Sequence, residues 1–337
     1  MAADVPLSAH TVYHDLLQAL LDQQVTGLVG KPLLREISGK LYWYAKSRLG
    51  DRVVQRYIGP DTVDLRARLA ERQTKRENDK AAGERRSLQV AQLRAARLPA
   101  PDRATARIVD ALAKVGVFRL GGTLVGTHAF RLYDAELGAR VTDETTAATE
   151  DIDIAAFERL SLALGDKVDP SLSETFRDLR LEPVPMLDRK GRTYRWRMDD
   201  GGAMLDILTP SFNEEETLRK LESLGVWAQS LHFLNFLIAD PIPAAMLYRS
   251  GVLVQIPRPE RYAVHKLIVS QRRRGIANPK VKKDLLQAQA LIRTLAHDRP
   301  GELRLAYRTA RDNGPAWRAA LDGALAARPE LKPLLDL

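Results

Sequence analysis

Two aspartates separated by one residue, Asp151 and Asp153, are the side chains in this sequence best suited to chemistry. Acidic and apolar residues alternate there, and a strand repeats every two residues, which places both carboxylates on one face. Two neighbouring negative charges repel each other unless a cation lies between them. Mg²⁺ prefers oxygen ligands and is usually held by one or two carboxylates together with substrate phosphates. With the glycine-hydroxyl turn that precedes it in the chain, the pair predicts a phosphoryl-transfer site with two metal ions.

A glycine turn upstream of these acids is suited to binding phosphate. The apolar pair Leu124-Val125 is expected to end a strand, and a helix is expected to begin at His128. Between them, Gly126-Thr127 supplies a turn whose backbone N–H groups and hydroxyl point toward an anion. Gly121-Gly122-Thr123 offers a competing frame. We prefer Gly126-Thr127 because it directly follows an apolar pair.

A third carboxylate, Asp206, lies in a strand expected over Ala203 to Leu208. A strand expected over Arg192 to Met198 precedes it, and Asp199 to Gly202 supplies a hairpin turn between the two. Because apolar residues flank Asp206, its burial is costly unless the charge is paired or bound to a metal. The alternative is that its face of the strand is simply solvated.

Taken together, these segments resemble the nucleotidyltransferase superfamily. They match its pattern of a glycine turn, an Asp-x-Asp pair and a later third acid, in Val125-Gly126-Thr127, Asp151-Ile152-Asp153 and Leu205-Asp206-Ile207. The segments LVGTHAF and TEDIDIA, with the N-terminal GKLYWY and RYIGP, are similar to a group of bacterial nucleotidyltransferase-like proteins of poorly assigned function. Thr127 stands where Ser or Gly is commoner, and the long spacing before Asp151 implies an insertion around Leu137 to Ala148.

The resemblance implies an enzyme that moves an NMP from an NTP such as ATP to a hydroxyl on RNA, a protein or a small molecule, with release of pyrophosphate. In this interpretation Asp151 and Asp153 hold two Mg²⁺ ions. Asp206 either completes the metal site or acts as general base. The turn at Gly126-Thr127 binds the phosphates of the nucleotide.

Two helices are expected near the C-terminus, over Glu260 to Arg274 and over Val281 to Ala296. The pair resembles the helical half of abortive-infection-type nucleotidyltransferases, where a helix lysine contacts phosphate and a later aspartate supports the site. Lys266 and Asp284 are the corresponding positions here, and the alternative is that both are ordinary surface charges. This second resemblance implies a role as a toxin, paired with an antitoxin protein, in a toxin-antitoxin or phage-defence system.

The N-terminal hundred residues carry much of the charge. Leu41–Tyr44 and Val53–Ile58 are expected to form a β-hairpin whose aromatics either pack in a core or stack on a base. Asp64 to Arg97 is expected to be one long, exposed, charged helix, either an arm for RNA such as tRNA or a salt-bridged solvated helix. With a net charge of +9, a third hypothesis is a catalytically silent module that binds RNA.

The fold class expected is α/β (α+β), a nucleotidyltransferase-type mixed sheet with an N-terminal helix-hairpin-helix extension and a C-terminal helical half. We expect domains at 1–100, 101–257 and 258–337. A charged helix is predicted over Asn213 to Leu224, and Leu231 to Ile238 suits either a strand or a helix. The sequence has no cysteine and no apolar run near the roughly 18 residues that span a bilayer, so we expect a cytoplasmic protein without a membrane partner.

Overall fold

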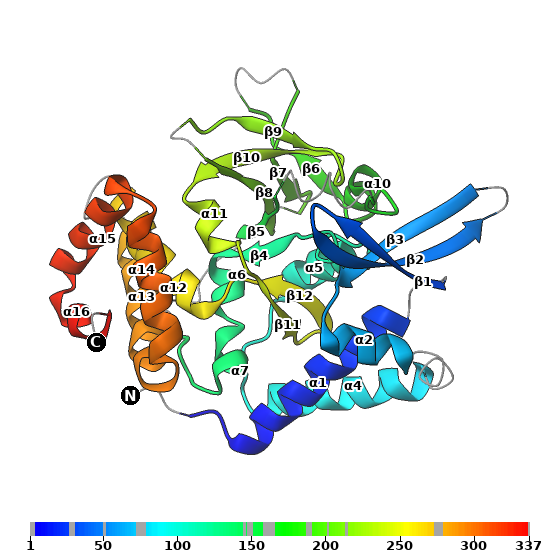
Figure 1. Cartoon of the computed structure of the whole chain (residues 1–337), viewed down its shortest axis with the longest axis horizontal. Helices are drawn as coiled ribbons and strands as arrows, with labels where there is room; N and C mark the ends of the chain where they lie inside the picture. The colour runs from blue at the N-terminus through cyan, green and yellow to red at the C-terminus, as the bar shows by residue number, and fades with distance from the viewer. Residues whose placement is uncertain are drawn as a thin grey trace.

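The computed structural model describes residues 4–26, 31–49, 52–71, 79–143, 146, 151–157, 166–186, 191–200, 202–212, 215–272 and 279–335. A mixed central sheet lies between an N-terminal part of helices with a small sheet and a C-terminal group of helices (Figure 1). This arrangement confirms the α+β fold class. No helix within the described ranges is long and apolar enough to cross a membrane.

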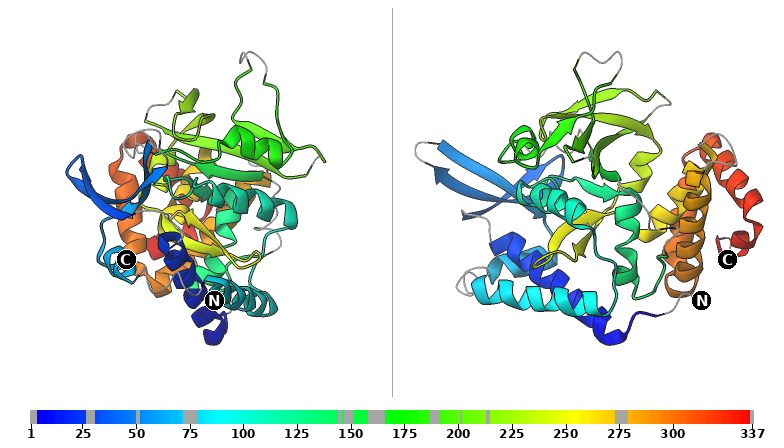
Figure 2. Two further views of the ribbon diagram at one scale, coloured as in Figure 1. Left: turned by 90° about the vertical axis from the view of Figure 1, so that its right-hand side faces the viewer. Right: turned by 180° about the vertical axis from the view of Figure 1, so that it is seen from behind.

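The N-terminal part is built around a three-stranded antiparallel sheet. It comprises α1 (Leu7–Thr26), β1 (Lys31–Ile37), β2 (Lys40–Leu49) and β3 (Arg52–Pro60). The hairpin of β2 and β3 confirms the prediction, and β1 is an unpredicted third strand. Tyr44 and Tyr57 are buried with Leu120, so these hairpin aromatics pack in a core. The sheet projects from the body of the molecule (Figures 1 and 2).

The prediction of one long exposed helix over Asp64 to Arg97 is wrong. Two helices, α2 (Val63–Ala70) and α4 (Asp79–Ala95), occupy this stretch, and residues 72–78 lie outside the described part. Helix α4 packs along α1, where its Val90 and Leu93 are buried. These apolar anchors lie C-terminal to the run of charged residues that suggested an exposed arm.

The central sheet has the strand order β4-β5-β8-β10-β9. These strands are β4 (Thr123–Val125), β5 (Asp151–Ala155), β8 (Met204–Ser211), β10 (Val226–His232) and β9 (Leu218–Leu221). Strands β5 and β10 run parallel to β8, whereas the outer strands β4 and β9 run antiparallel to their neighbours. The first half of β8 also pairs antiparallel with β7 (Arg195–Met198), which confirms the predicted hairpin. Beyond β7 lies β6 (Leu181–Pro183), in antiparallel pairing.

Short helices surround the sheet and connect its strands. They are α5 (Arg103–Lys114), α6 (Gly126–Phe130), α7 (Tyr133–Leu137) and α10 (Leu172–Asp178). Asp102 precedes α5 as its N-cap, and its side chain accepts a hydrogen bond of 2.9 Å from the Thr105 N–H. Ile152 and Ile154 of β5 are fully buried, and this turns Asp151 and Asp153 toward the opposite face.

The charged helix predicted over Asn213 to Leu224 is also wrong. Residues 213 and 214 lie outside the described part, and β9 occupies the following stretch as an edge strand, with Leu221 opposite Val226 of β10. Burial of Leu221 and Leu224 against the sheet outweighs the helical propensity of the charged residues. The segment Leu231 to Ile238 contains both structures that suited it, because β10 ends at His232 and α11 (Leu234–Leu237) follows.

The C-terminal half is helical after a two-stranded sheet of β11 (Ile242–Met246) and β12 (Val252–Ile256). Its elements are α12 (Pro259–Arg272), α13 (Pro279–Asp298), α14 (Pro300–Asp312), α15 (Pro315–Ala327), the 3₁₀ helix η2 (Pro329–Leu331) and α16 (Lys332–Leu335). One cluster of buried apolar side chains extends from Ile108 in α5 to Leu335 in α16. The helical group therefore shares a core with the central sheet, and the domain boundaries at 100 and 257 stay predictions.

Candidate active site

The turn between β4 and α6 lies directly against the Asp-x-Asp pair. Gly126 has a φ of +66°, and a Cβ atom built there would overlap Oδ2 of Asp153. Only glycine tolerates both the left-handed conformation and this close approach. In contrast, Gly122 of the competing frame packs against Val117, away from the acids. The structure thus places the Gly126-Thr127 turn beside the carboxylates.

Strand pairing brings the three predicted acids side by side. Val125 of β4 is opposite Asp153 of β5, and Asp153 is in turn opposite Asp206 of β8. Asp151 is two residues earlier on the same face of β5. The sequence could not reveal this arrangement, because it depends on β8 inserting next to β5 from more than fifty residues away.

The acid pair is electrostatically strained. Burial raises the pKa of Asp153 to about 7, and repulsion by Asp206 and then Asp151 adds to the increase. Lys266 and Arg195 act in the opposite direction. An acid so placed gains from any further cation that approaches it, which is the property expected of a metal ligand.

Asp206 is held by Arg195 of the neighbouring strand. The guanidinium donates from Nε to Oδ1 at 2.7 Å and from Nη2 to Oδ2 at 2.5 Å, and the two residues are direct partners across β7 and β8. The same bond raises the pKa of Arg195 above its usual range. The buried carboxylate therefore has the charged partner that its apolar neighbours require. The register of the predicted hairpin was the signal that could have identified Arg195.

Lys266 and Asp284 form a second ion pair, between α12 and α13. The Nζ of Lys266 lies 2.7 Å from Oδ1 of Asp284, and the two side chains are only 12% and 2% exposed. They are not the surface charges of the alternative interpretation. Lys266 reaches the site from the helix side, opposite the strands that carry the acids.

Tyr262, one turn before Lys266, connects the helices to the glycine turn. Its hydroxyl donates to the Gly126 carbonyl at 2.9 Å and lies 3.1 Å from Oε1 of Gln287. The amide of Gln287 in turn donates to the Thr146 carbonyl at 2.7 Å, and the Lys266 ammonium lies 5.2 Å from the Tyr262 ring centroid. Sequence reasoning missed Tyr262 and Gln287, although the spacing of Tyr262 from Lys266 places both on one helix face.

These groups line one cavity of about 380 Å³. Its walls include Gly126, Thr127, Asp151, Asp153, Lys266 and Asp284. Three further cations line it, namely Arg272, Lys280 and Lys283. Arg272 is followed by Arg273 and Arg274, which lie outside the described residues. Asp206 is not part of the cavity lining, although it pairs with Asp153 across β5 and β8.

His128, in the first turn of α6, is 2% exposed. Burial lowers its pKa to about 4, and the nearby positive charges of Arg131 and Lys283 contribute to the decrease, against the opposing effect of Asp102. The imidazole is therefore neutral at physiological pH. Lys283, which contributes to this decrease, also lines the cavity.

The donor set of the site suits a hard divalent cation on two carboxylates. Asp151 and Asp153 provide oxygen ligands on one strand face, and their mutual repulsion is relieved by a cation. Among the described residues, no three Asp, Glu, His or Cys side chains are gathered closely enough to hold a metal ion between them. Asp206, the third acid, instead carries the guanidinium of Arg195.

Comparison with known protein families agrees with this geometry. Residues 103–312, more than half of the chain, match a family described as nucleotidyltransferase. Residues 13–67, which include most of α1 and the small N-terminal sheet, match a family described as a domain of unknown function. No curated protein matches the sequence.

Proposed function

Because this chain belongs to the nucleotidyltransferase family, we propose that it transfers an NMP group from an NTP to an acceptor hydroxyl with release of pyrophosphate. The family makes it a transferase that acts on a nucleotide. The proposal adds the Mg²⁺ dependence, the residues that act and the acceptor class.

One observation carries the proposal. The glycine turn touches the Asp-x-Asp pair, and Lys266 faces both across a single cavity. Phosphoryl transfer needs little covalent chemistry from the protein, since positioning and charge stabilisation account for most of the rate. A turn for phosphates, acids for a cation and a lysine across the cavity supply both.

The acids are proposed as the metal ligands. Asp151 and Asp153 would hold Mg²⁺ directly. Asp206 lies next to them and is ion-paired with Arg195. When bound, the metal supplies a Lewis acid for the phosphates and lowers the pKa of the acceptor hydroxyl. The number of ions, for which the sequence suggests two, depends on whether Arg195 releases Asp206.

The remaining residues bind and orient the nucleotide. The backbone of Gly126 and the hydroxyl of Thr127 face the phosphates, while Tyr262 fixes the turn through the Gly126 carbonyl. Lys266 and Lys283 neutralise the charge that accumulates on the leaving pyrophosphate. Asp284 keeps the Lys266 ammonium in place through the buried ion pair.

RNA is the acceptor that the charge distribution favours. Seven Lys or Arg residues and two acidic residues fall between positions 31 and 60, so the projecting N-terminal sheet supplies more than half of the net charge of +9. A basic surface of this kind binds phosphodiester backbones with a strong salt dependence. A toxin role with an antitoxin partner stays a prediction from resemblance.

The test is label transfer from each α-phosphate-labelled NTP in the presence of Mg²⁺ and total bacterial RNA. Wild type is compared with Asp153→Asn and with Asp178→Asn, an exposed acid on α10 that serves as the matched control. Label on RNA with wild type and Asp178→Asn, but not with Asp153→Asn, supports the proposal. Label on protein would identify a protein, not RNA, as the acceptor. Absence of transfer with retained salt-sensitive RNA binding would favour the silent binding module.

A further inference from the structure

The cavity continues beyond the acids along α12. Tyr262, Lys266, Val269 and Arg272 line it at intervals of three or four residues, which places them on one helix face. Lys266 belongs to the end with the acids and the glycine turn. Arg272 lies six residues further along, about 9 Å at 1.5 Å per residue, which is comparable to the length of a nucleoside.

The far end of the cavity has apolar walls on two sides. Leu231 ends β10, Leu234 and Leu237 belong to α11, and Val269 faces them from α12. Strand β8 pairs with β7 up to Asp206, and its pairing with β10 begins two residues later, at Leu208. Strand β8 therefore carries Asp206 in its first half and pairs in its second half with β10, whose end carries Leu231. Flat, mainly apolar ligands are bound between walls of this kind, with a few polar groups that fix orientation.

Glu216 is the acidic group at this end. Its Oε1 accepts from the backbone N–H of His232 at 3.0 Å and from Nη1 of Arg272 at 2.7 Å. The side chain is 28% exposed, so it is partly desolvated yet open to the cavity that it lines. Both bonds end on Oε1, and within the described part of the chain Oε2 is the oxygen that stays available to a ligand.

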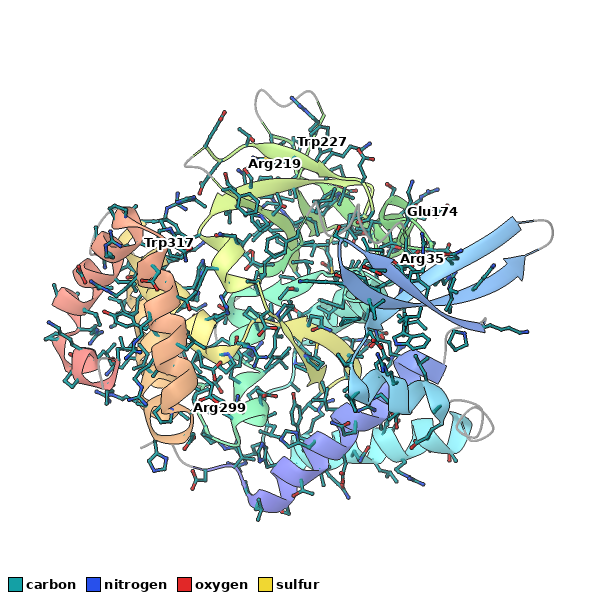
Figure 3. All side chains as sticks on the ribbon, viewed as in Figure 1. Arg35, Glu174, Arg219, Trp227, Arg299 and Trp317 are labelled. Atoms are coloured by element: carbon teal, nitrogen blue, oxygen red, sulfur yellow. The ribbon has the colours of Figure 1, made fainter. Side chains whose placement is uncertain are left out.

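The surroundings hold this carboxylate in a fixed position. The Arg272 guanidinium lies 5.5 Å from the ring centroid of Phe233, and Phe233 has a φ of +70°, an uncommon conformation for a bulky residue. The Phe233 ring packs on Trp317 of α15 at 4.6 Å between centroids. Trp317 is labelled in Figure 3, on the helical group. Strained backbone that packing overdetermines is common at ligand clamps.

We propose that this end of the cavity is the nucleobase subsite and that Glu216 selects bases with an amino group at C6 of a purine or C4 of a pyrimidine. The inference rests on the proposed nucleotide site and adds its base preference. An ionised carboxylate only accepts hydrogen bonds. Adenine and cytosine present an amino donor, whereas hypoxanthine and uracil present a carbonyl oxygen at the same position, which repels the carboxylate.

The test uses equilibrium binding of two matched nucleotide pairs, ATP against ITP and CTP against UTP, each with Mg²⁺ and without acceptor. One charged hydrogen bond predicts about 10- to 100-fold tighter binding of the amino member of each pair. Glu216→Gln retains an acceptor for Arg272 and His232 but adds an amide donor that tolerates a carbonyl. Its preference is expected to fall to about twofold or less, with unchanged thermal stability.

Glu222→Gln is the matched control, because Glu222 is 51% exposed and pairs with Lys220 outside the cavity. It is expected to keep the wild-type preference. Equal binding of both members by wild type, or a preference that survives in Glu216→Gln, would overturn the inference while label transfer leaves the proposed function intact. Absence of binding for every nucleotide would remove both.

Discussion

Each side of the cavity, the strand side and the helix side, has one predicted acid in an ion pair with a basic side chain. The two ion pairs differ in how far they are exposed to solvent. On the strand side, Arg195 and Asp206 are 34% and 8% exposed. On the helix side, Lys266 and Asp284 are 12% and 2% exposed. The helix pair thus belongs to the core, whereas the strand pair keeps its cation in contact with solvent.

This difference suggests different duties for the two pairs. A buried pair in which one partner is removed leaves an uncompensated charge and is strongly destabilising. A pair with an exposed cation costs less to separate, since water replaces part of the lost interaction. The helix side therefore supports the site rigidly, and the strand side can change partners when a metal approaches.

The largest effect is expected from Gly126→Ala on the strand side. A methyl group there would overlap the Asp153 carboxylate and displace it, and misplacement by about 1 Å costs on the order of 100-fold in rate. Gly39→Ala is the control, because Gly39 has a comparable φ of +74° but no atom within 4 Å of the added Cβ. Label-transfer rates measure both. A Gly126→Ala enzyme with normal activity would show that the turn does not position the acid.

The two ion pairs are compared by removing each cation. Lys266→Met is expected to lower the free energy of unfolding by about 3–5 kcal/mol, the usual cost of breaking a buried pair. Arg195→Met is expected to cost less, about 1–2 kcal/mol, because the side chain is 34% exposed and its removal lets water reach Asp206. Urea denaturation gives both values, and Lys220→Met serves as the exposed control. The reverse order would contradict the comparison.

The strand side should also make stability depend on pH. Because the folded-state pKa of Asp153 is raised from 3.8 to about 7, the native state holds a proton that the unfolded chain has released. The contribution of Asp153 to stability therefore falls as pH rises from about 4 to about 7, by up to about 1.4 kcal/mol per pH unit.

Asp153→Asn should remove this dependence, so that the difference from wild type increases across that window and is constant above it. His128 has the opposite effect, because its lowered pKa makes stability fall as pH decreases below about 6.5. This effect is common to both proteins. It cancels in the difference, which denaturation curves at several pH values provide. A difference that does not vary with pH would mean that Asp153 is ionised normally.

The last effect expected is stabilisation by Mg²⁺ alone. At pH 8 a metal on Asp151 and Asp153 should raise the stability of wild type by about 1–3 kcal/mol at saturating concentration, following the linkage of binding to folding. EDTA should reverse the effect, and the Asp151→Asn/Asp153→Asn variant should lack it. Thermal denaturation measures the shift. An equal shift in the variant would place the metal elsewhere.

Much of the site was readable from local pattern. The alternation around Asp151 and Asp153, the glycine turn after Val125 and the hairpin that contains Asp206 depend on residues close together in the chain, and local periodicity determines them. The helices that carry Lys266 and Asp284 were also predictable, because each has an apolar stripe of its own.

Where the sequence interpretation failed, packing against distant residues decided the structure. The stretch around Leu218 to Leu224 has the composition of a charged helix, yet β10 offered an open edge and it became β9. The stretch over Asp64 to Arg97 divided into α2 and α4, and α4 buried its last apolar residues on α1. In both cases tertiary contacts outweighed local propensity.

The sequence by itself determined which groups are available: two acids on one strand face, a third acid in a hairpin and a glycine turn. Only the tertiary structure decided that Asp206 lies opposite Asp153 under the guanidinium of Arg195, that Lys266 reaches Asp284, and that Glu216 joins β10 to α12. These contacts join residues far apart in the chain, and strand order and helix packing, which local periodicity does not encode, bring them together.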